Sequence, residues 1–487
     1  MNSSRFWRRC SPDRACLRPI AALLLVLALA WQAPASTMAQ GACGEFAVAV
    51  APQTPGQPLS DNVVSLMTPD GELASGTFEE PTTVTPSPKP GVALLRSLGG
   101  VFSLMDVATG EVRPLQIPED DQPRISETFP TIQNAAVADF MLLAALPYSV
   151  WLVDLATGDA LDLATLREDG PDFIDSAAIS PDGKWLIYSV QDEAFLISLE
   201  TPGDPAPLDT GRILAYPRFD DQSNVIYAVA GDPLVSIRSL EPKTGSRTDL
   251  FVTPGARLML MQRSPHIMLL DGDALISFPD GATTPTTLFE FEGDISGILT
   301  DTAGAHLLIG DDVDDMIAWY WVETATGRQT EIPELEGMVP SGPGQTRDAV
   351  LFMPTVLIGP GVPGASYKTF DLTTGVVQSV LEQDADDIWQ VLPSGDDQGR
   401  YVVVNAVSPG RGRVWLIDVQ GGTATHIGAS AGNVTAVVSP DGCQVAVGTF
   451  DTIGEGRTSS VTVTSLVDGS TTLQIPDAIL LGWSGVA

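Results

Sequence analysis

Lysine, histidine and cysteine are scarce in this chain of 487 residues, and each shortage narrows what the protein can do. The four lysines are Lys89, Lys184, Lys243 and Lys368, and the formal net charge is −36. A chain this acidic repels nucleic acids and anionic membranes. We therefore expect no nucleic-acid partner.

The amino terminus is typical of a cleavable signal peptide. Five arginines precede an apolar run at residues 20–31, which is too short to span a bilayer. Small residues follow, and cleavage after Ala39 would divide the chain into a signal peptide (1–39) and a mature part (40–487). Cleavage would change the net charge from −36 to about −40, because the leader carries five Arg and one Asp. We predict a secreted, periplasmic or cell-surface protein without a membrane span.

A lipid anchor on Cys43 is an alternative. It is disfavoured because about a dozen small or polar residues separate Cys43 from the apolar run.

Two short motifs recur along the mature part. Asp-x-x-Thr-Gly occurs at 106–110, 154–158 and 371–375, with weaker copies elsewhere, at a spacing of roughly 41 to 48 residues. Ser-Pro-Asp-Gly occurs at 180–183 and 439–442, with weaker versions at 220–224, 301–304 and 396–399. Proline presets the turn, aspartate accepts backbone N–H bonds, and glycine adopts the positive φ that reverses the chain.

The segments between these turns are rich in Val, Ile, Leu, Tyr and Trp, as strands require, and no ordinary amphipathic helix is evident. Repeats of 40 to 50 residues with about four strands match propeller blades. We predict an all-β propeller of eight to ten four-stranded blades, with a compressed unit at 257–289. Two tandem smaller propellers, or two packed sandwiches, are the alternatives.

The segment Ser-Pro-Asp-Gly-Lys-Trp-Leu-Ile-Tyr-Ser (180–189) resembles the repeat of TolB-type, WD40-like bacterial propellers. The spacing of the repeats resembles that family over most of the mature chain, and the residues themselves resemble it in a few segments. It implies the fold and an affinity for partners, and no catalytic residue.

Both ends of the chain match strands of one shared blade. Residues 478–484 match an innermost strand, 45–50 the second strand and 62–67 the third. Cys43 and Cys443 precede comparable strands in blades that such a closure makes neighbours, and Cys10 and Cys16 leave with the leader. We predict a Cys43–Cys443 disulfide; two unpaired cysteines are the alternative.

Gly428-Ala-Ser430-Ala-Gly432, with His426 nearby, matches the Gly-x-Ser-x-Gly nucleophile pattern. That pattern acts where a strand turns sharply into a helix, whereas here two strands flank it, so we interpret it as a loop.

Metal and cofactor sites receive little support. His266, His306 and His426 are too scattered to predict a three-histidine site. The acidic clusters 311–315 and 384–387 lack the spacing and glycine of a calcium loop, although Ca²⁺ stays an option there. Asp-x-x-Thr-Gly also resembles the repeat of pyrroloquinoline-quinone propellers, but the tryptophan that follows in that repeat is absent. We predict no catalytic, cofactor or metal residue, and we interpret Trp151, Trp185 and Trp415 as blade packing.

These features favour a non-enzymatic scaffold that presents propeller faces or the channel to protein, peptide or glycan partners. The alternatives are a structural component of a cell-surface assembly and an enzyme. The enzyme would be a lyase or hydrolase with carboxylates at the channel, or a cofactor-bearing oxidoreductase.

Overall fold

The protein is described here by a computed structural model that covers residues 43–486 with internal gaps. The gaps are 54–61, 81, 87–88, 98, 119–124, 127–131, 134–135, 138, 146–148, 164–173, 202–204, 215–216, 221, 231–233, 255–266, 272, 279–285, 314–315, 346–347, 355–358, 361–365, 383–387, 396–398, 409–410 and 452–457.

The described residues form ten sheets, numbered here in chain order from the sheet that both termini build. Sheet 1 contains β42 (Ala478–Gly485), β1 (Phe46–Pro52), β2 (Val63–Thr68) and β3 (Gly71–Thr77), and sheet 2 contains β4 (Thr82–Pro86), β5 (Val92–Ser97), β6 (Phe102–Asp106) and β7 (Val112–Pro114). Sheet 3 contains β10 (Ala136–Val137), β11 (Phe140–Ala145), β12 (Ser149–Asp154) and β13 (Ala160–Asp162), with β8 (Ile125–Ser126). Sheet 4 contains β9 (Ile132–Gln133), β14 (Ser176–Ile179), β15 (Trp185–Val190), β16 (Glu193–Ser198) and β17 (Ala206–Pro207), and sheet 5 contains β18 (Arg218–Phe219), β19 (Val225–Ala230), β20 (Leu234–Glu241) and β21 (Ser246–Pro254).

Sheet 6 contains β22 (Ile267–Asp271), β23 (Ala274–Phe278) and β24 (Thr286–Glu290), and sheet 7 contains β25 (Asp294–Thr300), β26 (His306–Val313), β27 (Met316–Glu323) and β28 (Arg328–Glu331). Sheet 8 contains β29 (Met338–Gln345), β30 (Ala349–Pro354), β32 (Ser366–Asp371) and β33 (Val376–Glu382). Sheet 9 contains β31 (Gly359–Pro360), β34 (Ile388–Gly395), β35 (Tyr401–Ser408), β36 (Arg411–Asp418) and β37 (Thr423–Ser430), and sheet 10 contains β38 (Asn433–Val438), β39 (Gln444–Asp451), β40 (Thr458–Ser465) and β41 (Thr471–Pro476). A short 3₁₀ turn, η3 (Pro333–Leu335), precedes β29.

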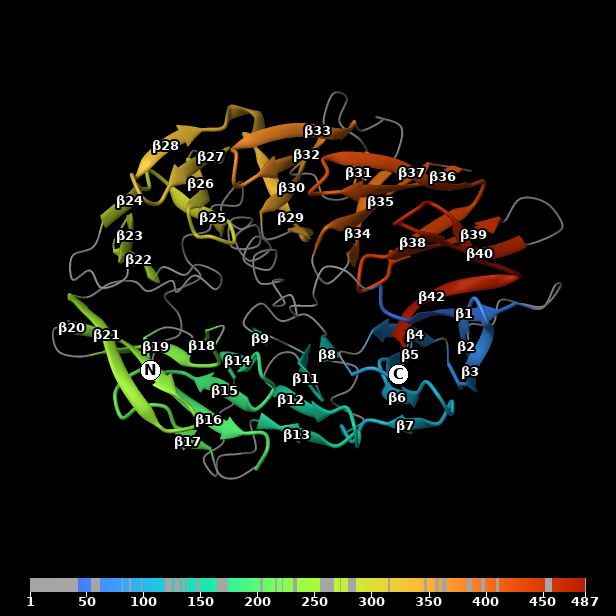
Figure 1. Cartoon of the computed structure of the whole chain (residues 1–487), viewed down its shortest axis with the longest axis horizontal. Helices are drawn as coiled ribbons and strands as arrows, with labels where there is room; N and C mark the ends of the chain where they lie inside the picture. Colours follow the sequence, from blue (N-terminus) through green and yellow to red (C-terminus); the bar gives the residue numbers. More distant parts are fainter. Residues whose placement is uncertain are drawn as a thin grey trace, which may run out of the picture.

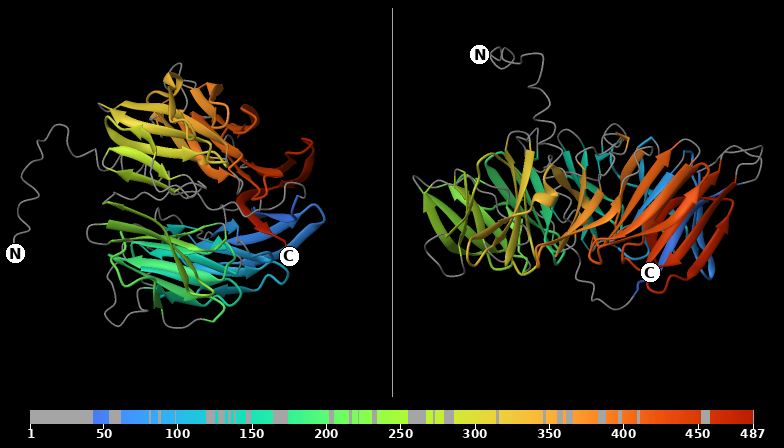
Figure 2. Two further views of the ribbon diagram at one scale, coloured as in Figure 1. Left: turned by 60° about the vertical axis from the view of Figure 1, so that its left-hand side comes forward. Right: turned by 90° about the horizontal axis from the view of Figure 1, so that it is seen from above.

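The sheets follow one another around a single closed ring, a β-propeller (Figure 1). Seen edge-on, the ring is a flat disc (Figure 2). Nine of the ten sheets have four or five strands and are full blades, which confirms the predicted all-β propeller of eight to ten blades. The described residues form neither two tandem rings nor two sandwiches.

Buried apolar side chains hold the ring together at its junctions. Ten clusters of buried residues each lie between two consecutive sheets, so that every junction around the ring has its own core. The inner strands of a blade are buried on both faces because each sheet packs against two neighbours. This explains the almost continuous apolar sequences of β1, β15 and β19, whereas the outer strand β28 is polar and exposed. Trp151, Trp185 and Trp415 pack in or against these clusters, as predicted.

The two ends of the chain complete one blade together. Strand β42 pairs antiparallel with β1, from Phe46 opposite Gly485 to Pro52 opposite Ala478, and β2 and β3 follow outward. This confirms the predicted closure. It also removes the open sheet edges that two unpaired ends would leave.

Sheet 6 departs from the regular blade, as the compressed repeat predicted. Strand β24 leads within a few residues into β25, the first strand of sheet 7, so the three strands correspond to the second, third and fourth of a blade. Residues 255–266, which precede them, lie outside the described part of the chain.

Candidate functional site

One face of the ring carries both turn motifs. In an antiparallel blade, the turn from the first to the second strand and the turn from the third to the fourth lie at the same end. The Ser-Pro-Asp-Gly turns make the first connection and the Asp-x-x-Thr-Gly turns make the other. We call this side of the ring the motif face.

The Asp-x-x-Thr-Gly turns are closed by the aspartate side chain. Oδ1 of Asp106 accepts hydrogen bonds from the N–H groups of Ala108 (3.0 Å) and Thr109 (2.8 Å) and from the Thr109 hydroxyl (2.9 Å). These bonds, led by the Thr109 N–H, lower the pKa of the Asp106 carboxyl. Gly110 has a φ of 73°, the positive value that the motif predicts.

The Ser-Pro-Asp-Gly turns depend on the serine. The Ser180 hydroxyl accepts hydrogen bonds from the N–H groups of Lys184 (3.2 Å) and Trp185 (2.9 Å) and donates one to Asp182 (2.5 Å). Ser180 is fully buried, so its hydroxyl serves the turn and is not presented to solvent.

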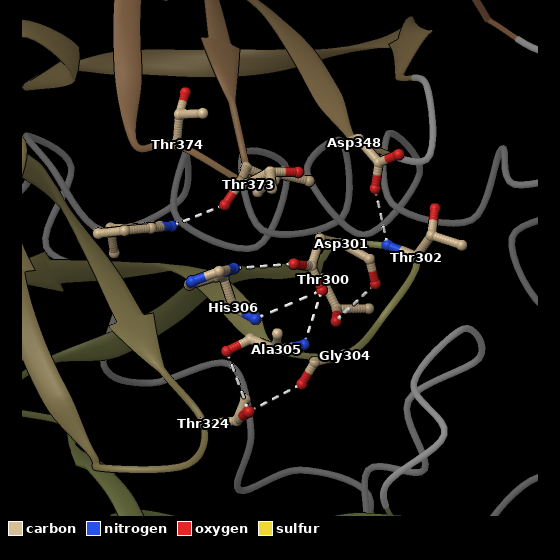
Figure 3. Close-up of polar contacts among 12 residues, drawn as sticks. Thr300, Asp301, Thr302, Gly304, Ala305, His306, Thr324, Asp348, Thr373 and Thr374 are labelled. Carbon is tan, nitrogen blue, oxygen red and sulfur yellow. Dashed lines mark hydrogen bonds and ion pairs between the residues drawn. The ribbon is translucent and has the colours of Figure 1, made fainter.

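Sheet 7 replaces this serine with Asp301 and thereby anchors a histidine (Figure 3). Oδ1 of Asp301 accepts the N–H groups of Ala305 (2.8 Å) and His306 (3.3 Å), as the serine does in its turn. The second oxygen, Oδ2, lies 2.9 Å from Nδ1 of the His306 ring. The Asp301 side chain is 3% exposed and the His306 side chain is 21% exposed.

The His306 ring is also held from the side. It stacks on Trp321 with ring centroids 4.7 Å apart, and the Trp321 Nε1–H donates to the Leu372 carbonyl of the next sheet (2.8 Å). Oδ1 of Asp348, from that same sheet, accepts the Thr302 N–H (2.9 Å; Figure 3). No hydrogen-bond partner of His306 Nε2 lies among the described residues. A carboxylate on Nδ1 orients an imidazole so that Nε2 can accept a proton, a hydrogen bond or a metal.

Of the other two histidines, the structure describes His426, which does not lie beside His306. His426 lies on β37 of sheet 9, where it meets Trp415 edge-on at 5.0 Å, and His266 falls outside the described residues. In the part of the chain that is described, one group of three metal-ligating side chains comes together, namely Cys43, Asp441 and Cys443. Two of these form a disulfide. The expectation that the histidines share no metal site stays a prediction, since one of them is not described.

Ser430 lies at the end of β37, and a short turn leads from it into β38. Its hydroxyl accepts the Gly432 N–H (3.0 Å) and donates to the Phe450 carbonyl (3.4 Å). The strand-to-helix turn of a hydrolase nucleophile is therefore not formed at this position.

The first acidic cluster contains a structural carboxylate. Asp311 is buried, and its two oxygens accept the N–H groups of Glu292 and Gly293, both at 3.0 Å. Asp314 and Asp315 of this cluster and the whole of 384–387 lie outside the described residues.

A buried charge network at the junction of sheets 4 and 5 was not found from the sequence. Asp209 accepts hydrogen bonds from Arg238 (2.8 Å), the Gly211 N–H (3.2 Å) and the Tyr227 hydroxyl (3.1 Å). Burial opposes ionisation of Asp209, but these bonds outweigh it and lower the pKa of the carboxyl. Burial, together with the charge of Asp209, raises the pKa of Tyr227 to about 12. The members are far apart in sequence, so no local pattern announces them.

The predicted Cys43–Cys443 disulfide is present, with Cα atoms 5.8 Å apart. Cys43 precedes β1 and Cys443 precedes β39, so the bond joins sheets 1 and 10 on the motif face.

No family model and no curated protein matches the sequence. Solved structures resemble it weakly. A eukaryotic initiation factor is 11% identical over 91% of this chain and 98% of its own, with a TM-score of 0.43. The dipeptidyl peptidase 4 of Porphyromonas gingivalis is 13% identical over 81% of this chain, with a TM-score of 0.39, and the match spans 59% of the peptidase. An oligogalacturonate lyase in complex with manganese is 14% identical over 58% of this chain and 98% of its own, with a TM-score of 0.33.

These likenesses carry no argument about function. They include enzymes and non-enzymes alike. Among the described residues, no helix is long and apolar enough to cross a membrane.

Proposed function

We propose that this protein is an exported binding scaffold whose motif face binds cationic segments of protein or peptide partners. The observation that carries the proposal is the array of carboxylates fixed by the turns of that face. Asp106, Asp154 and Asp371 each accept two backbone N–H groups of their own turn, so their positions are set before a partner arrives. Preorganised groups lose little conformational entropy on binding.

Further acidic side chains stand beside these turns. Glu111 and Asp159 directly follow the turn glycines of adjacent sheets 2 and 3, and both are exposed. Together with the net charge of −36, they attract basic segments and speed the encounter with them.

The predicted leader at residues 1–39 and the disulfide both support a place of action in an oxidising compartment outside the cytoplasm. Kinship with TolB-type propellers belongs to the same proposal, supported by the repeat at 180–189. Glycan recognition and a structural role in a surface assembly are less well supported, because neither explains the acidic turns.

A second candidate, an enzyme of the hydrolase or lyase type, is favoured by one observation. The Asp301–His306 pair has the geometry of an oriented general base. This candidate rests on that one pair alone, so we rank it second.

The scaffold proposal is tested with a fluorescent decalysine peptide and a decaglutamate control, by anisotropy over a series of salt concentrations. The variant E111Q/D159N removes two charges from the motif face. The variant D273N/E290Q removes two exposed charges from the opposite face and is the matched control. We expect the first pair to weaken decalysine binding by roughly threefold to tenfold and the second pair to have less effect. Equal effects of the two pairs would show that net charge alone attracts the peptide, and the motif face would lose its role.

A further inference from the structure

A carboxylate lies against the disulfide that closes the ring. An oxygen of Asp441 and the Sγ atoms of Cys43 and Cys443 all lie within 4.8 Å of one another. Cys43 is exposed and Cys443 is partly exposed, so small thiols can reach the bond from solvent.

The carboxylate is fixed in this position from both sides of the closure. Oδ1 of Asp441 accepts the Ser439 hydroxyl (2.6 Å) and the Cys443 N–H (3.1 Å), both from its own turn. Oδ2 accepts the Gly44 N–H (2.8 Å), which belongs to the other end of the chain. Asp441 therefore cannot turn away from the sulfur atoms without breaking these bonds.

We infer that Asp441 shields the Cys43–Cys443 disulfide from anionic thiols, so that the bond that closes the ring selects its reductants by charge. This inference does not depend on the proposed binding function. It concerns which small molecules can reduce the bond.

The chemistry of reduction explains the selectivity. A thiolate attacks one sulfur, the S–S bond breaks, a mixed disulfide forms, and the other cysteine leaves as a thiolate that takes a proton from water. A second thiolate attacks the mixed disulfide, releases the oxidised reductant and frees the second cysteine. Negative charge lies on the attacking and leaving sulfurs throughout, and a carboxylate oxygen within 4.8 Å of both sulfur atoms repels it. Each additional negative charge on the reductant increases the repulsion.

The chain offers a matched control for Asp441. Asp182 has the same position in the Ser-Pro-Asp-Gly turn of sheet 4, where it likewise accepts the serine hydroxyl (2.5 Å) and the N–H two residues on (3.2 Å). No cysteine of the described chain lies in that turn. D441N and D182N thus make the same change in charge and in turn chemistry, with and without a disulfide beside it.

The experiment measures reduction of the intact protein by three thiols whose reactive thiolate forms carry net charges of 0, −1 and −2: cysteamine, 2-mercaptoethanol and 3-mercaptopropionate. Alkylation at timed intervals and mass spectrometry of the peptides bearing Cys43 and Cys443 give second-order rate constants per thiolate. For the wild type we expect cysteamine to be fastest and 3-mercaptopropionate slowest. D441N should lower the ratio of the rate constants of cysteamine and 3-mercaptopropionate by roughly threefold to tenfold, and D182N should leave this ratio unchanged.

A structural effect gives a different result. If Asp441 only holds the turn together, D441N accelerates all three thiols by the same factor and the inference is wrong. The inference is also wrong if D441N and D182N lower the ratio of the rate constants equally, since the net charge of the protein would then account for the selectivity. Loss of the selectivity of the wild type in 1 M salt would agree with the inference, because salt screens a charge at an exposed bond.

Discussion

Two junctions in this ring are built very differently. Where the chain ends meet, sheets 10 and 1 share eight buried side chains, among them Trp483, and a disulfide crosses the same junction. Among the described residues between sheets 5 and 6, five buried side chains form a cluster, and none of these five is aromatic. Sheet 6 also has three described strands where the other blades have four or five.

The two junctions differ in the loop entropy that is lost when their strands come together. At the closure, the paired strands β1 and β42 lie at opposite ends of the chain, so bringing them together costs more loop entropy than any other strand pairing in the ring. Strong packing and a covalent bond offset this cost. Sheets 5 and 6 are consecutive in sequence, so joining them costs less loop entropy. We therefore expect the ring to open first beside sheet 6 and last at its ends.

The largest expected effect is at the closure. Trp483 is 1% exposed, and its Nε1–H donates to the Val437 carbonyl of sheet 10 (3.0 Å). We expect Trp483→Ala to cost about 3 to 5 kcal/mol of stability, because it leaves a large cavity and an unpaired carbonyl. Urea unfolding followed by circular dichroism measures it. A loss below about 1 kcal/mol would mean that the closure is not the strongest junction.

Removal of the disulfide comes next. We expect the C43S/C443S variant to lose about 2 to 5 kcal/mol, since the bond closes a loop between residues 400 positions apart and restricts the unfolded chain. Thermal unfolding of this variant is compared with that of the wild type under non-reducing conditions. If its transition does not move, packing alone holds the ends together.

The sequence predicted the closure better than the irregular side of the ring. The terminal strands and the Cys43–Cys443 pair could be predicted because turn motifs fix the strand positions and an oxidising compartment favours pairing. The number of strands in sheet 6 could not, because its repeat lacks clear turn signals. The Asp301–His306 pair had a signal that was not used: aligning the turn at 301–304 with Ser180 places an acid where the repeat has serine. The Asp209 network depends on tertiary contacts, which no local pattern encodes.

A smaller effect is expected at the opposite junction. Ile276 of β23 is 6% exposed and belongs to the cluster of described buried residues between sheets 5 and 6. We expect Ile276→Ala to cost about 2 kcal/mol, because it removes buried apolar groups and leaves a cavity. Hydrogen exchange should show reduced protection of the amides of β22–β24 in this variant, whereas the amides of β1 and β42 should stay protected. Equal loss of protection in both regions would show that the ring unfolds as one unit and would contradict the comparison.

The smallest effect concerns the ion pairs of Asp209 at the neighbouring junction of sheets 4 and 5. The Asp209 side chain is 7% exposed and pairs with Arg238, which also pairs with the exposed Asp249. We expect D209N to cost about 1 kcal/mol at pH 7, and the matched change D249N to cost less, since exposed ion pairs contribute little. The pKa of Asp209 is lowered in the folded protein, so its contribution is complete above the unfolded value of about 3.9 and is lost as the pH falls through the folded value. The difference between wild type and D209N in urea unfolding should therefore shrink from pH 7 to pH 3. A difference that is the same at both pH values would show that the carboxylate charge does not support this side of the ring.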